Sequence, residues 1–337
     1  MFKNLSKFMF FTTLITGTLI SISSSSWIGA WMGLELNLIS FIPLMINLKD
    51  MISTESSLKY FLSQAFASLI LLFSVILLSF FDILNFNSPN YYFNIILNST
   101  LLLKMGAAPF HFWFPEVMEG LNWILSIILM TWQKIAPMIL ISYSIDYNFF
   151  IIIILISIFI GSVGGLNQIS LRKLMAYSSI NHIGWLLSSF LISNFYWWIY
   201  FCFYSFLSFS IVYLFYKFKI FYFSQLFSFL NYYPILKFLL FCNFLSLGGL
   251  PPFLGFLPKW IIIQNLVFEN LFLVIMMIIF TLITLFYYIR ITYSAFFMNY
   301  MEIKWIYFKN LNLFSLIFFN FISLFGLLLI NFLYFIF

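Results

Sequence analysis

The chain has 337 residues, of which 64% are hydrophobic and only 7% are charged. Soluble domains carry about 25% charged residues, so this composition excludes a water-soluble globular protein and places most of the chain in a lipid bilayer. Nine acidic and fifteen basic residues give a net charge of +6. Charge spread this thinly is typical of the loops that set membrane topology, and we exclude a nucleic-acid partner.

Apolar stretches long enough to cross about 30 Å of hydrocarbon, roughly 20 residues each, recur along the chain. They do not alternate apolar and polar residues as the strands of a membrane β-barrel would. We therefore predict an all-α polytopic membrane protein with about eleven transmembrane helices in one membrane domain, 1–337. The predicted helices are 8–25, 27–46, 56–80, 95–115, 121–143, 148–166, 173–193, 195–217, 237–266, 272–298 and 311–336, with an aromatic-rich interfacial segment at 221–233.

The first predicted helix follows Lys3 and Lys7 and ends at a run of serines, 23–26, in a pattern that superficially resembles a signal peptide. We expect a retained first helix instead of a cleaved signal. The absence of an Arg-rich amphipathic leader also argues against import from the cytosol. Only 13 Gly and 9 Pro accompany 50 Phe. This bias favours an AT-rich genome, such as an animal mitochondrial one.

Basic residues predict the orientation of these helices. When the spans are threaded back and forth across the bilayer, ten basic residues fall in loops on the side of the N-terminus and none falls on the other side. Positive loops face the cytoplasm or the matrix, so we predict the N-terminus on the matrix side. The ten residues are Lys3, Lys7, Lys49, Arg172, Lys173, Lys217, Lys219, Lys237, Lys304 and Lys309.

Five basic residues fall inside predicted helices instead of loops: Lys59, Lys104, Lys134, Lys259 and Arg290. A charge at the bilayer centre costs about 2.5–3.5 kcal/mol on insertion scales, so it usually faces protein or water and marks a pathway for ions or protons. We expect Arg290 to extend to the interface, because it lies about two turns from the end of its helix.

Lys104, Lys134 and Lys259 share a second feature, which is a helix-breaking proline close by. These prolines are Pro109, Pro137 and Pro258. Proline frees the carbonyl four residues earlier, and irregular backbone at this depth persists only where it lines a wet or protein-walled cavity. Burial disfavours the charged form of a lysine, so each lysine is a candidate for a reversible proton carrier. A chance coincidence of kinks and lysines is the alternative.

Glu35, midway along the second predicted helix, is the carboxylate best placed to pair with these lysines. A carboxylate that moves or changes partner can switch a nearby lysine between holding and releasing a proton. The alternative is a hydrogen bond in helix packing, for which Asn37 is the neighbouring polar residue.

Two further groups of charges lie nearer the predicted membrane edge. Glu55 and Lys59 are four residues apart, so they share one helix face and can form an ion pair. Proton uptake and a simple anchoring pair both remain open for Lys59. We interpret Glu116 and Glu119 as solvated loop charge.

His111 and His182 are the only histidines, and Cys202 and Cys242 are the only cysteines. An iron–sulfur cluster needs four thiolates, and these residues do not supply the four ligands of a structural zinc site. Haem ligation requires two facing histidines, which the spacing does not support, and no glycine-rich phosphate loop is present. We expect no cofactor or metal on this chain, and we interpret both histidines as proton relay or polar packing.

Several segments of the chain carry a resemblance to a known family. They are WMGLELN at 31–37, LKMGAAPFHFWFP at 103–115, TWQKIAP at 131–137, GGLNQ at 164–168, LRKLMAYSSINHIG at 171–184 and LGGLPPFLGFLPKW at 247–260. Together they resemble the proton-conducting, antiporter-like membrane subunits of respiratory complex I, and they extend along most of the chain.

The resemblance implies inverted repeats with two broken helices, here the fourth and ninth. By motif, Glu35 matches the glutamate that pairs with the first channel lysine, and Lys104 matches that lysine. Lys134 matches the connecting lysine, and Lys259 matches the broken-helix lysine of the second half-channel. Lys59, His111 and His182 remain possible uptake or relay residues.

The resemblance also implies partners and a place in the cell. Proton translocation would be coupled to NADH-to-ubiquinone electron transfer in the mitochondrial inner membrane, with NADH, flavin, iron–sulfur clusters and ubiquinone on other subunits. Other membrane-arm subunits and lipids such as cardiolipin would be its neighbours. Ser170 stands where related subunits often have an acidic residue, and bacterial members have more helices than we predict here. A stand-alone cation/proton antiporter and a structural spacer are the alternative functions.

Overall fold

The computed structural model describes residues 5–47, 50–83, 90–230, 234–297 and 318–327. Over these residues the secondary structure is helical, apart from one isolated bridge between Ser170 and Tyr222. The prediction of an all-α fold is therefore confirmed. The chain divides into two compact units, Met1–Ser157 and Ile158–Phe337, and the prediction of one membrane domain stays a prediction.

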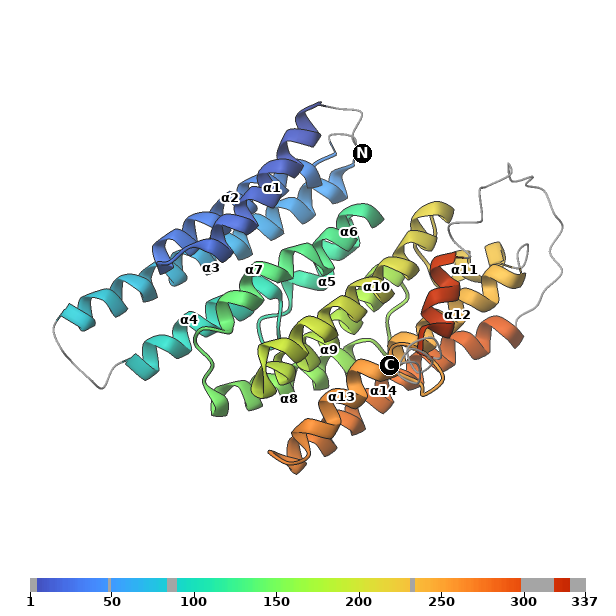
Figure 1. Cartoon of the computed structure of the whole chain (residues 1–337). Helices are drawn as coiled ribbons and strands as arrows, with labels where there is room; N and C mark the ends of the chain where they lie inside the picture. Colours follow the sequence, from blue (N-terminus) through green and yellow to red (C-terminus); the bar gives the residue numbers. More distant parts are fainter. Residues whose placement is uncertain (1–4, 48–49, 84–89, 231–233, 298–317, 328–337) are drawn as a thin grey trace. The chain divides into compact units, whose positions relative to one another are not determined.

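The first unit begins with a tight helical hairpin, drawn in dark blue in Figure 1. A Cβ atom at Gly33 would lie only 2.5 Å from the backbone nitrogen of Ser21 and 2.8 Å from the carbonyl oxygen of Gly17. Glycine thus permits close backbone contact between the first two helices. The helices of this part of the chain are α1 (Leu5–Ser23), α2 (Trp27–Met45), α3 (Met51–Ile83), α4 (Asn90–Met105), α5 (Trp113–Gly120), α6 (Trp123–Met130), α7 (Trp132–Ile141) and α8 (Tyr147–Gly164), the last of which contains the boundary between the units.

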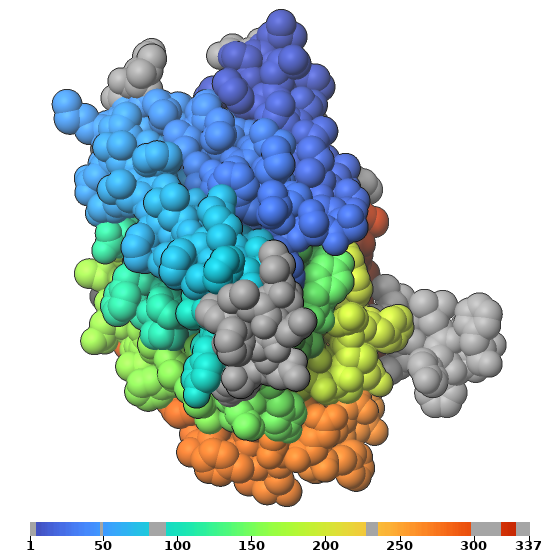
Figure 2. Space-filling view, turned by 90° about the vertical axis from the view of Figure 1, so that its left-hand side faces the viewer, coloured from blue at the N-terminus to red at the C-terminus, as the bar shows by residue number. Residues whose placement is uncertain are grey.

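Apolar side chains cover the outward face of α3. Leu62, Phe66, Leu69 and Phe73 are 58–68% exposed and follow one another at helical spacing. The surface of α1 to α3 is the blue area of Figure 2. A broad exposed apolar face is expected where lipid replaces water as the solvent of the protein.

The second unit is built around α9, which is buried on nearly all sides. Its helices are α9 (Leu171–Ile192), α10 (Asn194–Phe218), α11 (Phe223–Leu230), α12 (Pro234–Gly248), α13 (Phe256–Leu266) and α14 (Leu271–Phe297), with a further helix at 318–327. Helix α9 contacts α10 and α13, and α12 contacts α10, α13 and α14. The side chains of Asn243 in α12 and Asn320 in the last helix are joined by a hydrogen bond.

The fourth and ninth predicted helices are broken, as expected. Helix α4 ends with hydrogen bonds from the Gly106 nitrogen to the Leu103 carbonyl (3.1 Å) and from the Ala107 nitrogen to the Leu102 carbonyl (3.0 Å). Helix α12 ends in the same way, with bonds of 3.0 Å and 3.3 Å from residues 249 and 250 to the carbonyls of residues 246 and 245. This pattern is the Schellman motif. Its glycine adopts a left-handed φ, 75° at Gly106 and 84° at Gly249.

Other boundaries differ from the prediction. Helix α3 begins at Met51 rather than at residue 56, because a polar first turn held by hydrogen bonds to the Asp50 carbonyl is invisible to hydropathy. The fifth predicted helix is interrupted at Thr131 and forms α6 and α7. Most of the predicted helix 311–336, and residues 231–233 of the interfacial segment, lie outside the described residues. Among the described residues seven helices are long and apolar enough to cross a membrane, so the count of eleven stays a prediction.

Candidate functional site

Glu35 lies in α2, and Lys104 lies in the last turn of α4 and is 7% exposed. The charge of Glu35 acts on the Lys104 ammonium and on the hydroxyl of Tyr60. One carboxylate oxygen of Glu35 is buried without a hydrogen-bond partner in the part of the chain that the structure describes. The side-chain oxygen of Asn37 accepts a 3.0 Å hydrogen bond from Gln133. The pairing of Glu35 with Lys104 stays a prediction.

Neutral side chains bind two carbonyls at the end of α4. The side-chain amide of Gln64 donates to the Lys104 carbonyl at 3.3 Å, and the indole N–H of Trp113 donates to the Leu103 carbonyl at 3.0 Å. These bonds tie the broken helix to α3 and to its own second half, α5. The Lys104 side chain therefore does not have to bind the end of its own helix.

Lys134 of α7 is 1% exposed, and its ammonium lies 5.4 Å from the centre of the Phe114 ring. Phe114 belongs to α5 and packs against Gly106. A Cβ atom added at Gly106 would lie 3.0 Å from the Cβ atom of Phe114. A cation over an aromatic face is stabilised by the quadrupole of the ring. The helix break near Lys134 lies at Thr131, one turn before the lysine, and not at Pro137, which lies inside α7.

Lys259 of α13 is 6% exposed and reaches back to the end of α12. Its ammonium donates to the carbonyls of Gly248 at 2.9 Å and Leu247 at 3.2 Å, and it lies 5.9 Å from the ring centre of Trp185. The last carbonyls of a helix carry partial negative charge, which favours a cation. Lys259 thus binds two carbonyls at the end of α12 that are not part of its Schellman motif.

The four predicted relay residues fall in both units. Glu35, Lys104 and Lys134 lie in the first unit on α2, α4 and α7, and Lys259 lies in the second. All three lysines are buried in a chain with only 7% charged residues. A single polar row through all four residues at the bilayer midplane stays a prediction.

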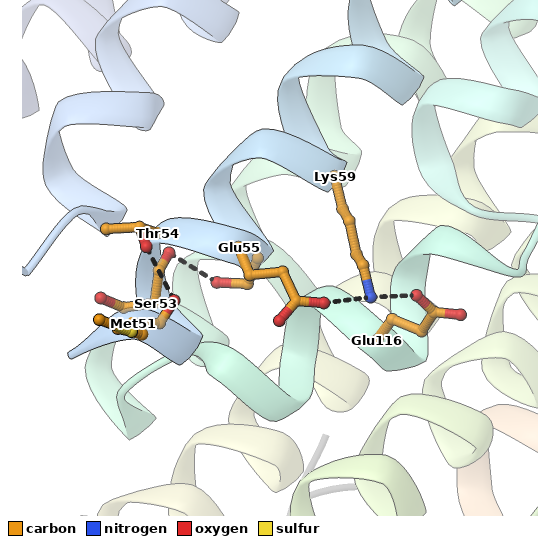
Figure 3. A network of polar contacts seen from close by, with 7 residues as sticks. Met51, Ser53, Thr54, Glu55, Lys59 and Glu116 are labelled. Carbon is orange, nitrogen blue, oxygen red and sulfur yellow. Dashed lines mark hydrogen bonds and ion pairs between the residues drawn. The ribbon is translucent and has the colours of Figure 1, made fainter.

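Lys59 forms two ion pairs at the start of α3, and Figure 3 shows its ammonium between the two carboxylates. It lies 3.0 Å from Glu55 and 2.8 Å from Glu116, with side-chain exposures of 42%, 67% and 54% for the three residues. The pair with Glu55 was expected from the sequence. Glu116 lies in the first turn of α5 rather than in a loop, which corrects its interpretation as loop charge: spacing along one helix cannot reveal a partner on another.

The two histidines lie in different units. His111 lies between α4 and α5, with its Nδ1 3.2 Å from the Pro109 carbonyl. His182 of α9 is 5% exposed, and its Nδ1 lies 2.8 Å from the hydroxyl of Tyr200 on α10. Relay and polar packing remain open for His111. Sequence reasoning missed Tyr200, because one tyrosine among 20 gives no signal.

The remaining residues considered in the sequence are Arg290, the two cysteines and the possible metal ligands. Arg290 of α14 is exposed and donates a hydrogen bond to the Leu166 carbonyl, and its reach to the membrane interface stays a prediction. Cys202 is exposed and Cys242 is buried, both as free thiols. Within the described ranges no group of three or more His, Cys, Asp or Glu residues could hold a metal ion.

Comparisons with known proteins define the class of this fold and site. Residues 24–285 match the family model described as NADH:quinone oxidoreductase/Mrp antiporter, transmembrane. The fold resembles a chain of respiratory complex I from Thermus thermophilus, with a TM-score of 0.82 and 20% identity over 96% of this chain and 78% of that chain. It also resembles a chain of the Mrp complex from Dietzia, with a TM-score of 0.70 and 15% identity over 84% and 59% of the two chains. The chain is thus an antiporter-like multi-pass membrane protein.

Closer relatives narrow this class. The chain is 57% identical to NADH-ubiquinone oxidoreductase chain 2 of Anopheles gambiae over 312 residues, which are 92% of each chain. It is 44% identical to the protein of that name from Locusta migratoria over 308 residues, 91% of this chain and 90% of the other. The chain belongs to the NADH-ubiquinone oxidoreductase chain 2 family.

Proposed function

We propose that this chain is a proton-translocating core membrane subunit of respiratory complex I in the mitochondrial inner membrane. It couples NADH-to-ubiquinone electron transfer to proton pumping and is an enzyme only as part of the assembly. NADH, flavin, iron–sulfur clusters and ubiquinone are bound by other subunits, and this chain binds none of them. Its neighbours are other membrane-arm subunits and lipids such as cardiolipin. Membership of the chain 2 family supports this assignment.

The observation that carries the mechanism is the burial of Lys104, Lys134 and Lys259 at 7%, 1% and 6% exposure. A buried ammonium is costly, so a lysine in such a place readily exchanges its proton when a nearby charge changes. When Glu35 is an anion it favours the ammonium form of Lys104, and when Glu35 is protonated Lys104 is free to release its proton to the next carrier. Repetition of this step through Lys134 and Lys259 moves one proton without moving a helix across the membrane.

Lys134→Met tests the proposal, because methionine keeps the apolar stem of lysine and removes its charge. The complex should assemble, while NADH:quinone turnover and proton flux fall together by roughly tenfold or more, the range of a positioned proton carrier. Both fall because electrons cannot flow downhill without driving the protonation cycle. Lys217→Met is the matched control, since Lys217 is an exposed lysine near the end of α10.

Assembled Lys134→Met complex with normal turnover and normal flux would contradict the relay and favour a structural spacer. The description of the matching family model also names Mrp antiporters, which supports a second candidate, a stand-alone cation/proton antiporter. This candidate predicts cation-driven proton exchange by the isolated chain in liposomes. The proposed function predicts no exchange without the rest of the assembly.

A further inference from the structure

One face of α9 carries His182 and Trp185 toward α10 and α13, next to Lys259. The Nδ1 atom of His182 and the hydroxyl oxygen of Tyr200 are 2.8 Å apart, and the two residues are only 5% and 2% exposed. The Tyr200 ring is parallel to the Trp185 ring, with an interplanar angle of 3° and centres 6.4 Å apart. The Trp185 ring in turn lies 5.9 Å from the Lys259 ammonium. Tyr200 therefore touches both the histidine and the aromatic group beside the lysine.

A hydroxyl is the one kind of partner that can serve a histidine in both protonation states. When the imidazole is neutral and Nδ1 is an acceptor, the Tyr200 O–H donates to it. When His182 is protonated, Nδ1–H becomes a donor and the Tyr200 oxygen accepts. A carbonyl suits only the donor state, and a lysine suits only the acceptor state. The contact can thus persist while the proton count of His182 changes.

A neighbouring tyrosine provides a contrast. The Tyr204 ring centre lies 5.0 Å from that of His182, and its hydroxyl bonds to Ser179. Tyr204 is 4% exposed and lies one helical turn from Tyr200 on α10. The titratable groups around His182 are thus Tyr200 and Tyr204 on α10, Lys259 on α13 and, next to Tyr204, Tyr288 on α14.

We propose that Tyr200 is a positioning residue that holds Nδ1 of His182 in both protonation states, so that the histidine can take up and release a proton beside Lys259. The proposal rests on the proton-relay function above. For uptake at Nε2 the neutral histidine carries its hydrogen on Nδ1, so the Tyr200 oxygen accepts the Nδ1–H bond both before and after the proton arrives. The proton binds to Nε2 and leaves from the same nitrogen, and Tyr200 gains and loses no proton.

Tyr200→Phe keeps the ring on Trp185 and removes the hydroxyl, and Tyr204→Phe is the matched control. Both variants are measured in the assembled, purified complex. We expect Tyr200→Phe to assemble normally, to lower pump-linked turnover about tenfold and to change its pH profile, because the ring of His182 loses the bond that orients it. We expect Tyr204→Phe to keep both the turnover and the pH profile of the wild type.

A double-variant cycle separates a role through the histidine from a role in packing. If Tyr200 acts through His182, Tyr200→Phe adds no further loss in a His182→Gln background. Three results would each overturn the proposal. The first is a double variant whose loss of turnover is the product of the two single losses. The others are an unchanged pH profile in Tyr200→Phe, and failure of Tyr200→Phe to assemble while His182→Gln assembles. Lys134→Met, measured in parallel, distinguishes failure of the role of Tyr200 from failure of the proposed relay. Loss of flux in that variant with a wild-type Tyr200→Phe refutes only the role of Tyr200, whereas wild-type flux in Lys134→Met refutes the relay itself.

Discussion

Substitution of one glycine tests whether the position of the Lys259 ammonium matters. Gly249 ends α12 with a φ of 84°, and a Cβ added there would lie 2.9 Å from Cδ and 3.1 Å from Nζ of Lys259. Gly249→Ala therefore pushes directly on the side chain that binds the carbonyls of Leu247 and Gly248. No charge is removed, so the variant changes geometry alone.

The expected magnitude has two parts. The left-handed conformation costs alanine about 1–2 kcal/mol relative to glycine, a cost that lowers stability without blocking assembly. A contact of 2.9 Å forces the Lys259 side chain to shift by several tenths of an ångström, which weakens hydrogen bonds of a charged group worth about 1.5–3 kcal/mol each. Because a misplacement of about 1 Å can reduce a reaction rate about 10²-fold, we expect proton flux to fall roughly 10-fold to 100-fold.

The neighbouring residue supplies the control. A Cβ at Gly248 would meet Tyr288 and Leu285 at ordinary contact distances of 3.4 Å or more and would not touch Lys259. Turnover and proton flux are measured in liposomes that contain the assembled complex, per mole of complex. Gly249→Ala should lose most of both, and Gly248→Ala should lose little. The reasoning fails if Gly249→Ala pumps like the wild type, or if Gly248→Ala loses as much.

Two further predictions concern residues outside the buried lysines. Lys59→Met should change proton flux by less than about twofold if the exposed ion pairs with Glu55 and Glu116 only anchor α3 and α5; a larger loss of flux in assembled complex would assign Lys59 to proton uptake. Burial raises the pKa of the Asp146 carboxyl in the loop after α7, although a hydrogen bond from Asn98 opposes this. The folded chain therefore holds this proton more tightly than the unfolded chain, and stability falls as the pH rises through the raised pKa. Asp146→Asn should flatten this fall in the melting temperature of the complex as the pH rises from the ordinary Asp pKa of about 3.9, and an equally steep fall would contradict the reasoning.

The sequence was sufficient to predict where the charges and the breaks lie. A lysine inside an apolar run is conspicuous, and the family resemblance implied breaks in the fourth and ninth helices, which contain Pro109 and Pro258. The pair of Glu55 with Lys59 follows from helix geometry alone. These predictions succeed because each depends on residues that are close together in the chain.

The surroundings of the lysines could not be predicted in the same way. Phe114 under Lys134, Trp185 beside Lys259 and Tyr200 on His182 are aromatic residues in a chain that is 24% aromatic. Aromatic residues are so common in this chain that these three do not stand out. They also lie far along the chain from the groups they contact, so no helical spacing connects each pair. Only the packing of separate helices selects these three side chains from the 50 Phe, 20 Tyr and 10 Trp.

The two broken helices show how one local motif leads to two different lysine environments. Both α4 and α12 end in a Schellman motif at a left-handed glycine, which leaves the last carbonyls of the helix to be bound by side chains. In α4 the side chains of Gln64 and Trp113 bind carbonyls, and the Lys104 side chain is left for a titratable partner such as Glu35. In α12 Lys259 binds the carbonyls itself. In the proposed relay, Lys104 would therefore respond to the charge of Glu35. Lys259 would instead respond to the fixed dipole of a helix end, so a change in its neighbours would have to drive the release of its proton.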